Sequence, residues 1–354
     1  MSIRSAFAQY QTRGMQFMTF RAALNFHKLP TSRSWVSAEQ KITDAATTPL
    51  KVKEDTALLN RIFQDNIRYG NKAVQITRFD NVAAPLFTTL KQAVFTPTYK
   101  PASFELGITN AVDLNLLSMT PELVFVEPSS KEGCFTLFFY ARSYITEKEQ
   151  FLIDDMKDEL SQQRFAGFDQ IIAYRRIAYV RIDTIFIDQN DLRVEFRVDI
   201  TRLDSLDRMQ EALKALKEAF RTYLVQNANS KWADVVFPLI NLYPKIPSVY
   251  ADKKGTVVRL GHHTSTGAIN QGKMRGLLGD LKQDPGHVAG MAAVVTESFS
   301  ITKLFSYDSG YSSVRLSIPG RSADAGQPDA RVVTAIIEDC HREEQFEDMA
   351  SILR

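Results

Sequence analysis

The sequence predicts an α+β fold in which antiparallel hairpins form a sheet and amphipathic helices flank it. Three observations carry this prediction. Hydrophobic residues alternate with a period of two over several segments between residues 120 and 200, turn-forming residues separate these segments in pairs, and a later segment changes to the helical period of 3.6. Successive hairpins with flanking helices favour an antiparallel sheet over a doubly wound parallel one.

The first half of the central region predicts a hairpin followed by a helix. Two apolar runs in residues 122–141 are separated by Pro128, Gly133 and the polar residues between them, which is typical of a hairpin. Thr146 is followed three positions later by Glu149, a capping-box pattern, and apolar residues at helical spacing come after it. We therefore expect a helix from Thr146 onward.

The second half of the central region predicts another hairpin and another helix. Residues 177–200 alternate strongly, and the polar residues 188–191 divide them into two strands. Apolar residues then fall three and four apart from Leu206 to Leu224, with charged residues on the opposite face. The predicted order for the middle of the chain is therefore β-β-α-β-β-α.

The flanking regions are predicted from shorter patterns. A helix is expected over residues 56–67 in the N-terminal third. We expect three domains or regions: an N-terminal mixed α/β region (1–115), the β-β-α-β-β-α domain (116–230) and a C-terminal α+β region (231–354). In the last of these the sequence predicts a strand (256–260), a short helix (271–281), a hairpin (299–305 with 313–318), a surface loop (321–328), a strand (332–338) and a closing helix.

Composition excludes several classes of protein. The chain has 354 residues, of which 44% are hydrophobic and 24% charged, as expected of an ordered globular protein. No uninterrupted apolar run reaches eighteen residues, so a membrane span is not expected. Cys134 and Cys340 are too far apart for a CxxC site, and we expect free thiols in a cytoplasmic protein.

A basic, glycine-rich segment over residues 253–282 is the most unusual part of the sequence. It contains six basic residues and a single acidic one, Asp280, although the net charge of the whole chain is only +2. Gly267, Gly272 and Lys273 match the spacing of a phosphate-binding P-loop, but Met274 stands where such a loop needs a hydroxyl to hold magnesium. A nucleotide cofactor is therefore not predicted.

Phosphate contact remains the prediction for this segment. Glycine allows backbone amides to approach an anion, and a helix beginning near Gln271 would add its positive end. The predicted phosphate or nucleic-acid contacts are Lys254, Arg259, Gly267, Gly272, Lys273 and Arg275.

Catalytic candidates are fewer. His262 or His263 could act as a general acid or base beside a bound phosphate, although neighbours on an extended chain face opposite sides and cannot share a metal. Asp191 with Glu195 approaches the carboxylate pattern of a metal-dependent nuclease, but Arg197 replaces its lysine. The histidine and cysteine spacings predict no metal site.

Three hypotheses follow from the sequence. The first is a non-enzymatic, nucleic-acid-associated subunit that contacts phosphates through the basic segment and works with a protein partner. The second is a phosphate-handling enzyme, either a metal-dependent nuclease or a nucleotide hydrolase. The third is a protein-only scaffold whose basic N-terminus and acidic C-terminal helix would associate with further copies of the chain. The sequence favours binding over catalysis and predicts no membrane contact.

Overall fold

The computed structural model of the chain describes residues 2–80, 89, 111–129, 131–152, 158, 163–165, 167–275 and 279–354. Its helices are α1 (Ile3–Arg13), α2 (Phe17–Phe26), α3 (Trp35–Ala45), α4 (Pro49–Tyr69), α6 (Ala111–Leu116), α8 (Leu206–Asn227), α9 (Ile246–Ala251), α10 (Pro285–Ala293) and α11 (Glu343–Leu353). Its strands are β1 (Lys72–Arg78), β2 (Glu122–Pro128), β3 (Cys134–Leu152), β4 (Gln170–Asp188), β5 (Arg193–Asp199), β6 (Thr256–Thr264), β7 (Ile269–Lys273), β8 (Thr296–Tyr307), β9 (Ser312–Ile318) and β10 (Ala335–Glu338).

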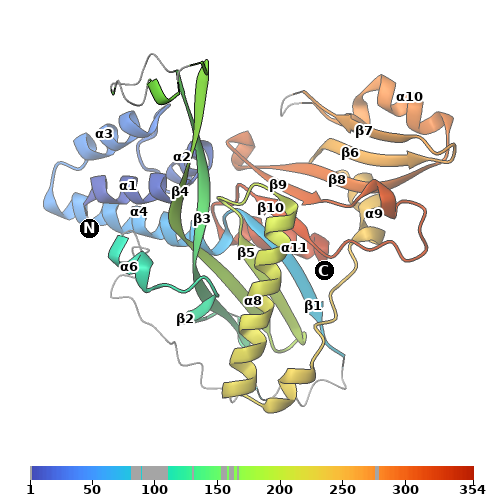
Figure 1. Cartoon of the computed structure of the whole chain (residues 1–354), viewed down its shortest axis with the longest axis horizontal. Helices are drawn as coiled ribbons and strands as arrows, with labels where there is room; N and C mark the ends of the chain where they lie inside the picture. The colour runs from blue at the N-terminus through green and yellow to red at the C-terminus, as the bar shows by residue number, and fades with distance from the viewer. Residues whose placement is uncertain are drawn as a thin grey trace.

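The described strands form one ten-stranded sheet in the order β2-β3-β4-β5-β1-β10-β9-β8-β6-β7. Every neighbouring pair is antiparallel, so the predicted α+β class with an antiparallel sheet is confirmed. β1 lies in the centre, where it pairs with β5 on one side and β10 on the other (Figure 1). The sheet is thus continuous from the central to the C-terminal region, and the three-part division of the chain stays a prediction.

All three predicted hairpins have their paired strands in the structure, and the first consists of β2 and β3, in which Glu122 pairs with Tyr140. β4 and β5 join through a turn after Asp188, which pairs with Arg193, and β8 and β9 join through the short helical turn Asp308–Gly310. The amphipathic segment after β5 forms α8, as predicted. The sequence patterns succeed here because each hairpin is closed by a local turn, so its two strands meet without help from distant residues.

The helix predicted from Thr146 is wrong where the structure can be compared with it. Residues 146–152 continue β3, and Thr146 pairs with Arg176 of β4. The capping-box pattern describes only a local preference, whereas β3 and β4 pair along 19 residues each and satisfy their backbone groups across the ribbon. The remainder of that predicted helix lies largely outside the described residues, so the β-β-α-β-β-α order is not confirmed.

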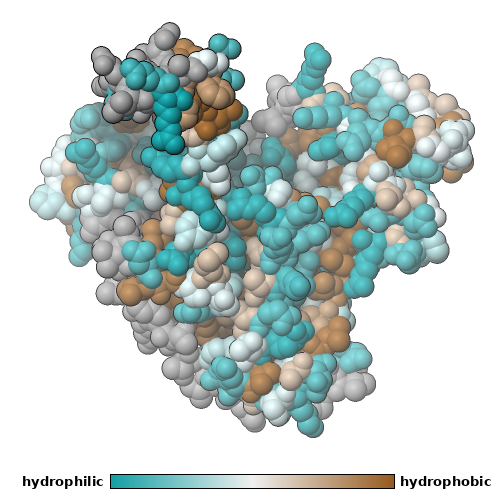
Figure 2. All heavy atoms as spheres, in the orientation of Figure 1, coloured by the Kyte–Doolittle hydropathy of each residue, from teal (hydrophilic) through white to brown (hydrophobic). Residues whose placement is uncertain are grey.

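Helices cover both faces of the first half of the sheet. On one face, α8 packs Leu216 and Phe220 against Ile185 and Phe196 (Figure 1). On the other face, helices α1–α4 pack against residues such as Phe138, which alternates with Phe139 of the α8 face. Side chains exposed on α8 are mostly hydrophilic, as the space-filling view shows (Figure 2). The strands between these two layers are therefore buried on both sides.

A third hydrophobic cluster lies in the C-terminal half of the sheet. It joins Val74 of β1 and Leu316 of β9 to Phe346 and Met349 of α11, and Leu260 of β6 belongs to it as well. The two cysteines are buried and free. Within the described ranges no helix is both long and apolar enough to cross a membrane.

Buried charges connect the central strands to both ends of the chain. Glu195 of β5 is fully buried, and its carboxylate contacts Arg197 at 2.6 Å, Arg354 at 2.6 Å and Arg193 at 3.0 Å. Arg13 of α1 pairs with the buried Asp199 of the same strand at 2.8 Å. Because Arg13 belongs to α1 and Arg354 directly follows α11, these two arginines fix both ends of the chain relative to β5.

The ionised form of Glu195 is favoured in the folded protein. Burial alone would raise the pKa of its carboxyl, but the guanidinium groups of Arg197, Arg354 and Arg193 together lower that pKa below its usual value. A carboxyl with a lowered folded-state pKa stabilises the fold above its unfolded pKa, and this stabilisation is lost as the pH falls through the folded value.

We expect Glu195→Gln to lower the free energy of unfolding by about 3–5 kcal/mol at pH 7.5, because it leaves three guanidinium groups without their buried counter-ion. Glu347→Gln is the matched control, since Glu347 belongs to the same cluster but is 35% exposed, and its loss should be within about 1 kcal/mol. Urea unfolding of the wild type and both variants measures the difference. Equal losses for the two variants would contradict a central role for Glu195.

Candidate functional site

The basic segment forms the hairpin of β6 and β7 at one edge of the sheet. β7 is the last strand, paired only with β6, and residues 265–268 connect the two. The helix predicted over residues 271–281 is therefore wrong at its start, because Gln271 pairs with Gly261 inside the sheet. Pairing with β6 satisfies the backbone of residues that would be only a short, weakly favoured helix on their own. The positive helix end predicted at Gln271 does not exist.

Two cations face each other across this hairpin. Arg259 of β6 and Lys273 of β7 are direct cross-strand partners, so their side chains leave the same face, and both are exposed. Arg259 donates a hydrogen bond to the Gln271 side chain at 2.8 Å. The carboxylate of Asp280, the acidic residue of this segment, accepts hydrogen bonds from the backbone amides of Val257 and Lys282.

Lys254 and Arg275 extend the basic surface beyond the pair. Both are exposed and flank the two strands, Lys254 before β6 and Arg275 after β7. The backbone N–H of Met274 donates to the carbonyl of Val258, which holds the chain leading to Arg275 beside β6. Four of the predicted cations thus lie on or beside one hairpin.

Two glycines of the segment are explained by packing. A Cβ at Gly261 would lie 2.6 Å from the ring of Phe299, and one at Gly272 would lie 2.9 Å from the side chain of Leu281. Gly267 differs, because it lies in the connecting turn with φ +90°, is exposed, and a Cβ there would meet nothing within 4 Å. Of the two glycines predicted to approach a phosphate, only Gly267 has an open backbone position.

The neighbouring histidines face opposite sides of β6, as their spacing requires. His263 pairs with Glu297 of β8, so a carboxylate is its cross-strand neighbour. His262 is 7% exposed and points to the face that α10 covers, where its ring lies 5.9 Å from the ring of His287. Adjacent side chains of a strand point to opposite faces, so the two imidazoles cannot share a metal, and only His263 lies on the face of Arg259.

A cavity of about 470 Å³ lies between the hairpin and α10. His262, Gly272 and Lys273 form its strand side, and His287 and Gly290 belong to its helix side. Figure 1 shows α10 lying over β6 and β7, and Figure 2 shows hydrophobic residues exposed around it. α10 has no buried residue. Its partly buried Met291 packs against the C-terminal hydrophobic cluster, so α10 covers the cavity with little anchoring of its own.

The imidazole of His262 is buried in this cavity with an unsatisfied nitrogen. Its Nδ1 has no hydrogen-bond partner among the residues that the structure describes, and leaving a buried polar atom unpaired costs about 1–3 kcal/mol. Burial, and to a smaller degree the neighbouring His287, lowers the pKa of His262. His287 itself lies 3.2 Å from the Tyr250 hydroxyl through Nε2, and burial lowers its pKa too. The cavity therefore presents neutral imidazoles.

Sequence reasoning missed the residues of α10. The signal was present, because Asp284 followed by Pro285 is a typical helix start and Asp284 indeed accepts a hydrogen bond from the backbone of His287 at 2.8 Å. What the sequence did not show is that this helix folds back over the hairpin. Residues 276–278, between the two, lie outside the described part of the chain.

The two predicted carboxylates have a different environment from a nuclease site. Asp191 lies in the β4–β5 turn and pairs with Arg193 and Arg78, while Glu195 is enclosed by the three arginines described above. Within the described residues, no three His, Cys, Asp or Glu side chains are grouped so that they could hold a metal. Glu195 therefore serves the fold, and Asp191 does not share an open cleft with it.

No model of a known protein family matches the chain, and no curated protein matches its sequence. The assignment of a function therefore depends on the geometry of the chain itself.

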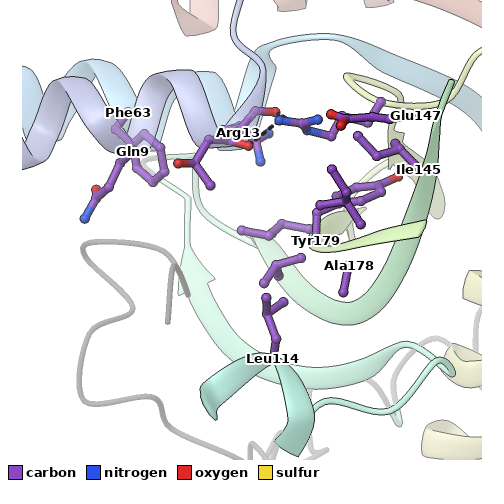
Figure 3. A pocket seen from close by; sticks show the side chains of 13 residues that line it. Gln9, Arg13, Phe63, Leu114, Ile145, Glu147, Ala178 and Tyr179 are labelled. Carbon is purple, nitrogen blue, oxygen red and sulfur yellow. Dashed lines mark hydrogen bonds between the residues drawn. The ribbon is translucent and has the colours of Figure 1, made fainter. Parts of the chain in front are cut away.

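An apolar pocket of about 240 Å³ lies between α1, α4 and the strands β3 and β4 (Figure 3). Phe63, Leu114 and Ile145 are among its walls. Its two arginines are already satisfied, since Arg13 contacts Asn66 and Asp199 and Arg202 donates to backbone carbonyls. Gln9, Glu147 and Tyr179 also line this pocket, and none of the residues predicted from the sequence to contact a ligand belongs to it.

A charged cavity of about 290 Å³ lies where α2, α4 and α11 approach the sheet. Arg197 stacks there between Phe186 and Phe346, with its guanidinium carbon 4.8 Å and 4.3 Å from the two ring centres. Burial raises the pKa of Asp65, which lines the same cavity, from its usual 3.8 to about 6. Its nearest ion-pair contact, Arg61, is 4.0 Å away, so the carboxylate is poorly compensated.

Asp65 should lower the stability of the fold as the pH rises. Because its folded-state pKa of about 6 lies above the ordinary value, the penalty grows between about pH 4 and 6 and is complete above that window. Asp65→Asn is expected to increase the free energy of unfolding by about 1–3 kcal/mol at pH 7.5 and by clearly less at pH 5. Denaturant titrations at the two pH values measure this, with the exposed Asp44→Asn as control. A gain independent of pH would contradict the assignment.

Proposed function

We propose that the chain is a non-enzymatic, nucleic-acid-associated subunit that contacts phosphates through the β6–β7 hairpin. The cross-strand pair of Arg259 and Lys273 carries this proposal. Like charges directly opposite each other in a sheet are destabilising, by a few tenths to about 1 kcal/mol. A phosphate between the two side chains would reverse the sign of that interaction.

The surroundings of the pair support the same conclusion. Arg259 and Lys273 are exposed at the edge of the sheet, and the acidic residue of their own segment is used to hold backbone amides. Lys254, Arg275 and the open turn at Gly267 continue the surface on which a phosphate backbone can lie. Contacts of this kind provide affinity without reading sequence, and they weaken as salt increases.

The protein partner of the proposal fits the exposed edge of the sheet. Among the described strands β7 has a neighbour on one side only, which leaves its other side as the edge to which a further strand could add. The scaffold hypothesis has less support, because Glu347 of the acidic C-terminal helix is paired with Arg197 and Arg354 inside the molecule. A cytoplasmic, reducing compartment stays part of the proposal.

The enzyme hypothesis finds no specific support in the geometry. His262 lies on the opposite face from Arg259 and Lys273. His263 shares their face but lies four residues along β6 from Arg259, about 13 Å at the rise of a strand, which is beyond hydrogen-bond reach of a phosphate held by the cation pair.

We expect the double variant Arg259→Gln, Lys273→Gln to bind a labelled oligonucleotide about tenfold or more weakly than the wild type in low salt. Removing two phosphate contacts should also reduce the slope of log affinity against log salt by about 1–2. Fluorescence anisotropy titrations of single strands and duplexes at several salt concentrations measure both quantities.

Lys53→Gln, Lys214→Gln is the control for net charge, since both of these lysines are exposed on helices far from the hairpin in sequence. It should keep the wild-type affinity within about twofold. If the control variant and the hairpin variant lose affinity equally, or if the wild type does not bind, the proposed contact is wrong.

A further inference from the structure

The cavity under α10 has the features of a built ligand site rather than a packing defect. His262 is more than nine-tenths buried and lines the cavity, and within the described ranges its Nδ1 has no hydrogen-bond partner. Its volume of about 470 Å³ falls in the range of small-molecule pockets. A neutral imidazole can donate or accept depending on its tautomer, so it can pair with either kind of heteroatom on a ligand.

The remaining walls narrow the chemistry of that ligand. Met274, Leu281 and Met291 supply apolar surface, which suits the flat faces of a ring, and Asn270 supplies an amide that can donate and accept. Asp284 also lines the cavity, but its carboxylate is used as the N-cap of α10. A flat heterocycle with polar atoms on its edge matches this combination.

Lys273 connects the cavity to the cation pair. It lines the cavity at the edge strand, whereas its cross-strand partner Arg259 projects from the face opposite His262 and does not line the cavity. We propose that the cavity binds the base of an unpaired nucleotide whose phosphate is held at this edge by Lys273. This inference rests on the phosphate contact proposed above for the hairpin and names the group that lies beside it.

The helix side of the cavity is shaped to leave room for such a group. His287, Gly290, Met291 and Val294 line it at spacings of three, four and seven residues, as one face of a helix does. Glycine is unfavourable inside a helix, and a Cβ at Gly290 would meet nothing within 4 Å. A larger residue at this position can therefore occupy the cavity without displacing the fold.

Gly290→Leu is the variant that tests the cavity. Ala289→Leu is its matched control, since Ala289 is exposed on α10 and does not line the cavity. Both substitutions place leucine in the same helix, so thermal unfolding should show that neither variant is less stable than the wild type.

Isothermal titration of the full chain with the four ribonucleoside 5′-monophosphates, the matching nucleosides and inorganic phosphate provides the measurement. At least one monophosphate should bind about tenfold or more tightly than inorganic phosphate, and Gly290→Leu should lose that advantage while Ala289→Leu keeps it. Monophosphates that bind no better than phosphate would overturn the inference, and so would equal behaviour of the two leucine variants.

The nucleosides separate this inference from the proposed function. They lack the phosphate, so nucleoside binding that is abolished by Gly290→Leu supports the cavity even if the hairpin variant binds oligonucleotides as the wild type does. Oligonucleotide binding that depends on Arg259 and Lys273, combined with no binding of nucleosides or monophosphates beyond that of phosphate, leaves the hairpin contact standing and overturns the cavity inference.

Discussion

The carboxylate of Glu195 is the interaction on which the arrangement of this molecule depends. A buried charge is tolerated only when it is paired and hydrogen-bonded, and here three guanidinium groups from β5 and the C-terminus converge on it. The same strand binds Arg13 of α1 through Asp199. The first and last helices of the chain are thus attached to one central strand by buried ion pairs. Breaking one of these pairs would require α1 or α11 to move away from β5.

The pairing of charges inside the molecule explains why a chain with almost no net charge can have an uneven distribution of charge on its surface. Carboxylates such as Glu195 and Asp188 are paired with arginines in the interior, and Asp280 is used by backbone amides. Acidic residues that are committed in this way do little to screen cations at the edge of the sheet, where water and salt are the alternatives. Arg259 and Lys273 carry the same charge as the buried arginines of the protein. They differ because they are exposed, whereas the buried arginines are paired with carboxylates.

Sequence patterns predicted the parts of this fold that local contacts decide. The β4–β5 hairpin and α8 follow from alternation, a turn and an amphipathic period, all of which act over a few residues. The error at Thr146 arose because a short capping pattern competed with pairing to Arg176, thirty residues away, and sheet pairing prevailed. The error at Gln271 has the same cause, since its partner Gly261 lies in another strand. Contacts between residues that are distant in the sequence cannot be predicted from the local spacing of hydrophobic residues.

The candidate site shows this division most clearly. Arg259 and Lys273 could be suspected from composition, but that they are direct partners on one face depends on the register of β6 and β7. His262 and His287 are 25 residues apart and meet only because α10 folds back over the hairpin.

The geometry around His262 also favours ligand binding over catalysis. A general acid or base needs a partner that orients it and a reacting group within hydrogen-bond reach, whereas the Nδ1 of His262 has no partner in the described structure. An unpaired nitrogen in a cavity that the exposed Lys273 also lines is an arrangement suited to holding a ligand, because the ligand itself supplies the missing partner.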